Sequence, residues 1–343
     1  MLFNMVKLSL FVSVLFTACS CSNVDSIPLA AAKGPSGFLI KGISVVAPVN
    51  VFNKTSLQPI ADINANSISI MPYAFCSIEN PEVKYNQHDQ HWGENSNGVI
   101  GSIQLAHQNK MSVMLKPHLW IGRGNYTGEF TLPTENDWQL WEGSYRNYIL
   151  HFATIADSLK AEIFCFGTEL GAAIKARPAF WSSLIDTLQQ VYHGKLTYAG
   201  NWDDYKSFPF WEKLDYIGVD AYFPLDADET PEINALKKGW RKYSDELEKI
   251  SKEHNRPILF TEYGYRNVDR TGAEPWKENA GSQNDKGQAN AFEALYQNFV
   301  GKKWFMGGYV WKWYTENSYH RKNIDFTPQG KPAEQVIKNW YRN

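Results

Sequence analysis

The segment EIFCFGTE, residues 162–169, is a short β-prone run that ends in a carboxylate, Glu169. Its apolar part has the length of one buried strand and is too short for an ordinary helix. A helical pattern follows at residues 178–192, and the next β-rich run begins at residue 195. Strand, helix and strand in this order are typical of a βα unit with a parallel sheet.

The same unit recurs along the chain. Eight β-rich runs lie at residues 39–47, 67–73, 112–120, 162–169, 195–201, 216–223, 257–263 and 307–313. Helical patterns lie at residues 56–64, 98–110, 137–159, 178–192, 230–254, 285–299 and 332–341, whereas 203–213 has room for only one or two turns. Eight such units over roughly 300 residues predict a single α/β domain, a (β/α)8 (TIM) barrel. An open doubly wound sheet is the alternative, but no G-x-G-x-x-G sequence follows any strand.

Composition excludes several functional classes. The 34 basic and 36 acidic residues give a net charge of −2, so no basic field is available to bind nucleic acid. Aromatic residues make up 15% of the 343 residues, and 13 of them are Trp. Such side chains fill cores, and they also provide flat surfaces on which sugar rings stack.

The amino terminus has the pattern of a bacterial lipoprotein leader. Lys7 precedes an apolar run at residues 8–16, and Thr17-Ala18-Cys19 resembles a lipobox in which Cys19 is acylated. A plain secreted protein is the alternative. Ser20 after the acylated cysteine favours the outer membrane or cell surface over the inner membrane. The expected division is a signal peptide at residues 1–18, a flexible tether at 19–37 and a catalytic domain at 38–343.

Two further cysteines, Cys76 and Cys165, lie in the expected domain. An oxidising compartment would permit a bridge, but two cysteines make no framework, and separate thiols are expected. His88 and His91 lie in a polar loop, and no Cys/His spacing resembles a zinc site. Neither a metal nor a cofactor is expected.

The barrel prediction directs attention to the carboxyl ends of the strands, because active sites of such barrels lie there. Aromatic, hydrogen-bonding and acidic side chains gather at these positions. The candidates are Lys116, His118, Trp120, Glu169, Asn201, Trp202, Asp220, Tyr222, Glu262, Trp311 and Trp313.

Two glutamates stand out because each closes an apolar strand. Glu169 ends the fourth predicted strand and Glu262 the seventh, and a carboxylate buried there is costly without a partner. A structural salt bridge, for example with Lys116 or Arg266, is one interpretation. The other is glycoside hydrolysis, which requires two carboxyl groups on opposite sides of a bond.

The segments around these glutamates resemble glycoside hydrolase family 113, the β-1,4-mannanases. The resemblance runs from about residue 41 to the C-terminus and rests on FGTEL at 166–170, FTEYGY at 260–265, YVWKW at 309–313 and DFTPQGKPA at 325–333. Most members of the wider clan of retaining barrel glycosidases have Asn before the acid/base Glu. Thr168 stands there in this chain, which favours family 113 over its relatives.

The resemblance implies a role for each glutamate. Glu169 would be the general acid and then the base, and Glu262 the nucleophile. Tyr222 is expected to hydrogen-bond Glu262 and keep it ionised, with Glu169 less well solvated. Retention requires the two carboxyl groups to lie about 5–5.5 Å apart, and a separation above about 6.5 Å indicates inversion.

Aromatic candidates are expected to bind sugar rings. Trp311 and Trp313 lie two apart in the eighth strand and should share a face, so the one at the mouth would floor the cleaved-sugar subsite. Packing inside the barrel is the alternative for both. Trp120 is the expected platform of a neighbouring subsite.

Polar candidates are expected to contact hydroxyl groups. Asn201, with Trp202 beside it, ends the fifth strand, and Lys116 and His118 lie two apart on the third. His118 is the better of these two, although a single His in a barrel strand is often a core residue. Asp220 could orient Tyr222 or anchor a loop.

The expected function is that of a monomeric, endo-acting β-1,4-mannanase that cuts mannan, glucomannan or galactomannan with retention and without a cofactor. A β-glucanase or an exo-β-mannosidase would use the same chemistry on another substrate. A non-catalytic, glycan-binding surface lipoprotein is the alternative from a different class. The presence of both Glu169 and Glu262 argues against it.

Overall fold

The computed structural model describes residues 38–122, 124–277, 281–316 and 323–342. The expected signal peptide, tether and acylated Cys19 lie outside these residues.

Eight parallel strands close into a barrel in the order β1-β11-β10-β9-β8-β7-β5-β2, which confirms the predicted fold class. Each strand pairs in parallel with its two neighbours because a helix or loop returns the chain to the same end of the barrel. The strands are β1 (Ile40–Val45), β2 (Ser67–Ile70), β5 (Ser112–Leu115), β7 (Ile163–Thr168), β8 (Lys195–Asn201), β9 (Ile217–Asp220), β10 (Ile258–Tyr263) and β11 (Phe305–Trp313).

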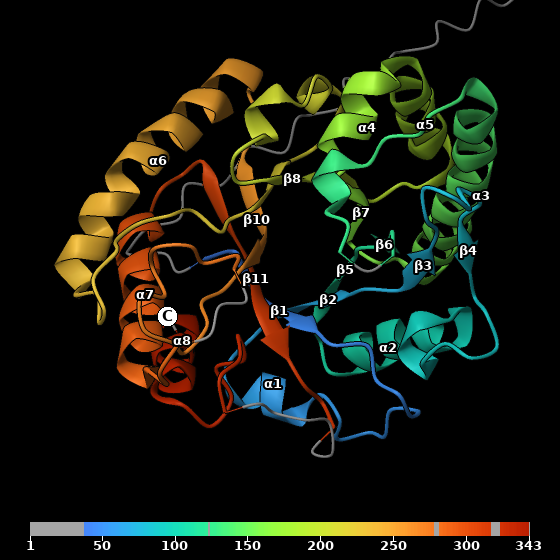
Figure 1. The fold of residues 1–343 in the computed structure, drawn as a ribbon. Helices are drawn as coiled ribbons and strands as arrows, with labels where there is room; N and C mark the ends of the chain where they lie inside the picture. The colour runs from blue at the N-terminus through green and yellow to red at the C-terminus, as the bar shows by residue number, and fades with distance from the viewer. Residues whose placement is uncertain (1–37, 123, 278–280, 317–322, 343) are drawn as a thin grey trace, which may run out of the picture. The chain divides into compact units, whose positions relative to one another are not determined.

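Helices surround the strands (Figure 1). They are α1 (Gln58–Asp62), α2 (Ser96–Gln108), α3 (Glu135–Leu159), α4 (Gly171–Ala176), α5 (Pro178–Val191), α6 (Ile233–His254), α7 (Asp285–Phe299) and α8 (Pro332–Arg342). The short connections contain the 3-10 turns η1 (Trp92–Glu94), η2 (Thr127–Glu129), η3 (Tyr205–Ser207) and η4 (Trp211–Lys213). As the sequence predicts, the segment after the fifth barrel strand, β8, holds only two such turns, η3 and η4.

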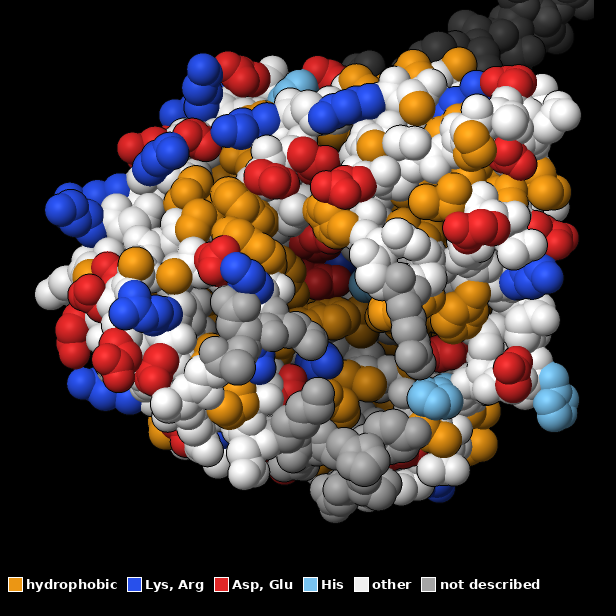
Figure 2. All heavy atoms as spheres, in the orientation of Figure 1, with side chains coloured by type: hydrophobic (Ala, Val, Ile, Leu, Met, Phe, Trp, Pro, Cys, Tyr) orange, Lys and Arg blue, Asp and Glu red, His pale blue; other side chains and the backbone are white. Residues whose placement is uncertain are grey.

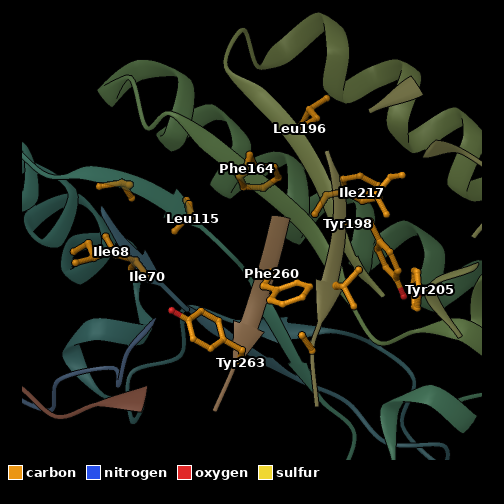
Figure 3. Packing of buried hydrophobic residues seen from close by; sticks show 14 of the residues in the cluster. Ile68, Ile70, Leu115, Phe164, Leu196, Tyr198, Tyr205, Ile217, Phe260 and Tyr263 are labelled. Carbon is orange, nitrogen blue, oxygen red and sulfur yellow. The ribbon is translucent and has the colours of Figure 1, made fainter. Parts of the chain in front are cut away.

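Apolar side chains form two cores, one on each side of the barrel wall. The smaller core includes Met114, Cys165, Leu259 and Tyr309. The larger core packs the other face of the strands against the helices; Figure 3 shows part of it, including Phe164, Tyr198 and Phe260. Most of the aromatic residues lie in this larger core, where Trp141, Trp181 and Trp240 are fully buried.

A bulge in β10 positions the seventh-strand glutamate. Phe260 and Glu262 pair with the consecutive residues Val219 and Asp220 of β9, so β10 holds one extra residue there. A bulge interrupts the alternation of side chains and re-aims one of them. Thr261 and Glu262 can therefore both approach Asp220 and its neighbours at the end of the barrel.

A three-stranded sheet of order β4-β3-β6 lies beyond the barrel and was not predicted. It consists of β3 (Tyr73–Phe75), β4 (Lys84–Tyr85) and β6 (His118–Trp120). The predicted strands 67–73 and 112–120 each divide at a proline, Pro72 or Pro117. Proline has no N–H to donate to a ladder, so barrel pairing stops and the chain turns into the second sheet.

Cys76 and Cys165 are both free thiols, as expected, and Cys165 is fully buried inside the barrel. Within the described ranges, no helix combines the length and the apolar character needed to cross a membrane.

Candidate active site

A cleft of about 660 Å³ lies at the carboxyl ends of the barrel strands. Figure 2 shows a hollow with acidic side chains at its floor and hydrophobic side chains around it. Nine of the predicted site residues line the cleft: His118, Trp120, Glu169, Asn201, Trp202, Asp220, Tyr222, Glu262 and Trp311. Two, Lys116 and Trp313, are absent from its lining.

Glu262 is held by hydrogen bonds to both of its carboxylate oxygens. Lys116 Nζ donates to Oε1 at 2.6 Å, and the Tyr222 hydroxyl donates to Oε2 at 2.8 Å, as the sequence analysis expects. Burial, and then the charge of Glu262, raise the pKa of Tyr222 well above its ordinary value, so the phenol keeps its proton and remains a donor. Glu262 itself is 6% exposed at the cleft floor.

Lys116 does not contact the cleft, which corrects its predicted role in substrate binding. Its side chain is fully buried, because it follows β5 into the barrel and ends between two carboxylates. Its ammonium lies 3.0 and 3.2 Å from the two oxygens of Asp220, in addition to the bond to Glu262. Burial lowers the pKa of Lys116, but Asp220 and Glu262 outweigh that effect and raise it above its ordinary value. Lys116 therefore forms the salt bridge to a strand-end glutamate, Glu262, that the sequence analysis gives as one interpretation.

Asp220 forms the other side of this buried network. Its carboxylate accepts hydrogen bonds from Lys116 and, at 2.8 Å, from the Thr261 hydroxyl. The Tyr222 hydroxyl donates to Glu262 instead, so Asp220 does not orient the Tyr222 side chain by a hydrogen bond. Burial and the nearby charge of Glu262 raise the pKa of Asp220 to about 7.

Glu169 lies in the cleft with a different environment. It follows β7 directly, its backbone N–H donates to the Ala199 carbonyl, and its φ of 51° is in the left-handed region. A residue other than glycine is uncommon there, and such conformations cluster at functional sites. Burial, followed by the charges of Asp220 and Glu262, raises the pKa of Glu169 well above its ordinary value. Glu169 therefore retains its proton to higher pH than an ordinary glutamate, whereas Glu262 accepts a hydrogen bond from the Lys116 ammonium.

His118 lies beside Glu262 as a neutral imidazole. Burial, and then the charge of Lys116, lower its pKa well below the ordinary value. Its Nε2 is 3.6 Å from Glu262 Oε1, and its ring packs against Tyr73 and parallel to Trp311. His118 thus faces the cleft rather than the barrel core.

The two tryptophans of β11 point to different environments, which corrects the expectation that they share a face. Trp311 lines the cleft, whereas Trp313 is 2% exposed and packs in the larger core. Between Ile43 and Val45 of β1, strand β11 advances three residues, from Val310 to Trp313. Strand β11 therefore holds one residue more than β1 over this stretch, and the alternation of its side chains between the two faces is shifted. Trp313 consequently points into the core, where it cannot contact a substrate.

Aromatic side chains also flank the cleft. Trp120 is 51% exposed, and Trp202 stacks on Trp276 with ring centroids 4.9 Å apart. Trp276 was not predicted, because it lies in the long loop between β10 and α7 and not at the end of a strand. Only the general excess of aromatic residues pointed to such a side chain.

Asn201 is held by two residues that the sequence analysis also missed. Its side-chain N–H₂ donates to the Tyr126 hydroxyl at 2.6 Å and to Asp203 Oδ1 at 3.0 Å. Tyr126 and Asp203 both line the cleft. They lie in loops, and their sequence neighbourhoods carry no periodic pattern that would indicate this placement.

No group of three or more His, Cys, Asp or Glu side chains suited to a metal ion occurs among residues 38–122, 124–277, 281–316 and 323–342. The arrangement offers one carboxyl group with a raised pKa, one carboxylate bonded by a cation, and aromatic surfaces around them. These are the groups needed to protonate a leaving oxygen and attack the carbon that it leaves.

Comparison with protein families found a match to Glycoside Hydrolase Family 113 over residues 50–331. A solved structure of a family 113 β-mannanase from Alicyclobacillus acidocaldarius, in complex with ManMIm, is 25% identical, with a TM-score of 0.78. The match covers 90% of this chain and 98% of that chain. A search of curated proteins found no match.

Two other solved structures share the fold. A family 113 β-1,4-mannanase in a complex structure is 24% identical, with a TM-score of 0.76, and the match covers 90% of this chain and all of that one (100%). A β-glucuronidase from Faecalibacterium prausnitzii is 14% identical, with a TM-score of 0.59, and the match covers 90% of this chain and 51% of that chain.

Proposed function

The chain belongs to glycoside hydrolase family 113, and on that basis we propose that it is an endo-acting β-1,4-mannanase in which Glu169 and Glu262 perform a retaining double displacement. One observation carries this assignment of roles. The two carboxyl groups share one cleft, but burial raises the pKa of Glu169 well above its ordinary value, while Lys116 and Tyr222 donate hydrogen bonds to the carboxylate of Glu262.

The first step uses this difference in protonation. Glu169 donates its proton to the glycosidic oxygen, and the C–O bond to the leaving chain breaks. Glu262 attacks the anomeric carbon from the opposite face and forms a glycosyl ester. Tyr222 and Lys116 orient the carboxylate for this attack, so binding substrate requires little reorganisation.

The second step regenerates the enzyme. Glu169, now ionised, removes a proton from water, and the resulting oxygen nucleophile breaks the ester bond to Glu262. Two inversions at one carbon retain its configuration. The roles require the two carboxyl groups to lie about 5–5.5 Å apart, as retaining enzymes do.

The cleft supports a polysaccharide substrate. Trp311 at the floor and the exposed Trp120 offer aromatic faces to the apolar sides of sugar rings, and Asn201 and Asp203 offer polar atoms to hydroxyl groups. The name of the family 113 neighbour, a β-mannanase, supports β-1,4-linked mannose as the main-chain sugar.

Release of reducing ends tests this proposal. Wild type should cleave mannan and glucomannan faster than cello-oligosaccharides, and long chains should give a range of manno-oligosaccharides. Release of mannose alone would indicate an exo-mannosidase, and a preference for cello-oligosaccharides a glucanase. Glu262→Ala should abolish hydrolysis but leave binding measurable. Binding by wild type without any cleavage would contradict an enzymatic role.

We also propose that the protein is a lipoprotein, anchored through Cys19 at the outer membrane or cell surface. The lipobox-like Thr17-Ala18-Cys19 and the following Ser20 support this location. Metabolic labelling with an alkyne fatty acid should mark the protein, and Cys19→Ser should abolish the label. Labelling that persists in the variant would contradict the proposal.

A further inference from the structure

The small sheet β4-β3-β6 presents two different faces. Side chains alternate along a strand, and residues paired in register lie on the same face. Ala74 and Leu119 are a register pair and both are buried. Tyr85, which pairs with Ala74, packs against Tyr148 of α3. This face is therefore covered by the larger core.

The other face is open and continuous with the cleft. The pair Tyr73 and His118 lines the cleft, and Phe75 and Trp120 form the next pair on the same face. Trp120 is 51% exposed and Phe75 is 38% exposed. Phe75 is not among the residues that line the cleft, so the aromatic surface continues past its rim.

From this register we propose that Phe75, side by side with Trp120, forms an additional subsite for one sugar ring of a substrate chain that extends out of the cleft. The proposal rests on the proposed function and names a feature of its substrate, a chain longer than the cleft itself holds. Neighbouring strands lie about 4.8 Å apart, a distance that one pyranose ring can span.

The surroundings fit a neutral, flat ligand. A single exposed aromatic residue is ordinary on a protein surface, but two in register beside a substrate cleft form a contiguous apolar surface. The apolar face of a sugar ring can stack on such a surface while its hydroxyl groups remain in water. Lys84, which pairs with Phe75 on the side away from Trp120, has a side chain that is 61% exposed, and its ammonium lies 4.0 Å from Glu82 at the edge of the sheet.

Steady-state kinetics on manno-oligosaccharides of increasing length test the subsite. Phe75→Ala should raise KM for the longer oligosaccharides by about threefold to tenfold, the effect of losing one aromatic contact. It should leave kcat, and KM for the shortest cleaved oligosaccharides, unchanged. Phe75→Trp should restore the low KM. Leu140→Ala, which removes an exposed apolar side chain from α3, is the matched control and should have no effect at any length.

Equal KM values for wild type and Phe75→Ala at every length would overturn the subsite, as would an equal rise at all lengths. This failure is distinct from that of the proposed function, in which wild type releases no reducing ends from any mannan. In that case, calorimetric titration with manno-oligosaccharides and cello-oligosaccharides replaces kinetics. A length-dependent loss of affinity in Phe75→Ala would support the subsite, and no loss would overturn it.

Discussion

Beneath the floor of the cleft, one ammonium group lies between two carboxylates. Lys116 bonds Glu262 at 2.6 Å and Asp220 at 3.0 Å, and all three side chains are buried. Removing one member of a buried ion pair leaves the others uncompensated, at a cost of about 3–5 kcal/mol. Lys116 does not line the cleft, so in the proposed mechanism it positions Glu262 and does not bind substrate.

Lys116→Met should reduce kcat/KM by about 10²–10³-fold, the effect of losing one preorganised electrostatic partner. Because the Glu262 carboxylate would lose its 2.6 Å hydrogen bond, the loss should fall mainly on kcat, with KM little changed. The measurement is kcat and KM on mannan. The matched control is Lys195→Met, which removes an exposed ion pair with Asp215 at the start of β8. An unchanged kcat in Lys116→Met would contradict the positioning role.

The raised pKa of Glu169 has a consequence for stability. In the unfolded chain a glutamate ionises near its ordinary pKa of about 4.3, whereas the folded protein keeps Glu169 protonated to higher pH. The unfolded state then binds fewer protons, so this group lowers stability as pH rises from the unfolded pKa through the raised folded pKa.

Glu169→Gln removes the titrating group and should melt higher than wild type at pH 7, by about 2–4 °C for each kcal/mol recovered. Near pH 4 the difference should shrink, because both states of the wild type are then largely protonated. Thermal melts at the two pH values measure it. A difference that is the same at both, or a lower melting temperature at pH 7, would show that Glu169 is not held protonated.

At the scale of single elements, the bulges in β10 and β11 decide which side chains reach the cleft. Strict alternation along a strand places Trp311 and Trp313 on one face, but the extra residue in β11 separates them. In the same way, the bulge in β10 lets Thr261 bond Asp220 while its neighbour Glu262 faces Lys116. Bulges depend on pairing between distant strands, so the periodicity of one strand did not predict them.

The two tryptophans should therefore respond differently to substitution. Trp313→Ala should destabilise the protein by about 3–5 kcal/mol, because it empties a buried site in the core. Trp311→Ala should raise KM for mannan by about threefold to tenfold, with a smaller change in stability. Chemical denaturation and steady-state kinetics on both variants separate the effects. Equal losses of stability would contradict the opposite placement of the two side chains.

The prolines in the second and third predicted strands mark where each of these strands divides. Pro72 and Pro117 occur at equivalent points, just after β2 and just after β5. A proline inside a central strand argues against its continuation. The three residues that follow each proline, Tyr73–Phe75 and His118–Trp120, consequently form strands β3 and β6 of the small sheet beside the cleft.

At the scale of the whole molecule, the barrel and the two glutamates were predictable because both depend on local signals. Apolar runs of strand length mark the barrel, and the last residue of each run marks the catalytic end. Trp276, Tyr126 and Asp203 were not predictable, because loops bring them to the cleft. Lys116 was found as a strand-end residue, but its buried position depends on Asp220, which is distant in the sequence.

The central claim is that Glu262 forms a covalent bond to the sugar while Glu169 supplies the proton. Incubation with a 2-deoxy-2-fluoro-β-mannobiosyl fluoride should trap this intermediate, because the fluorine slows its hydrolysis. Digestion and mass spectrometry should then find a single fluoroglycosyl group on the peptide that contains Glu262. A label on Glu169, or no label together with a first product of inverted configuration, would contradict the proposed double displacement.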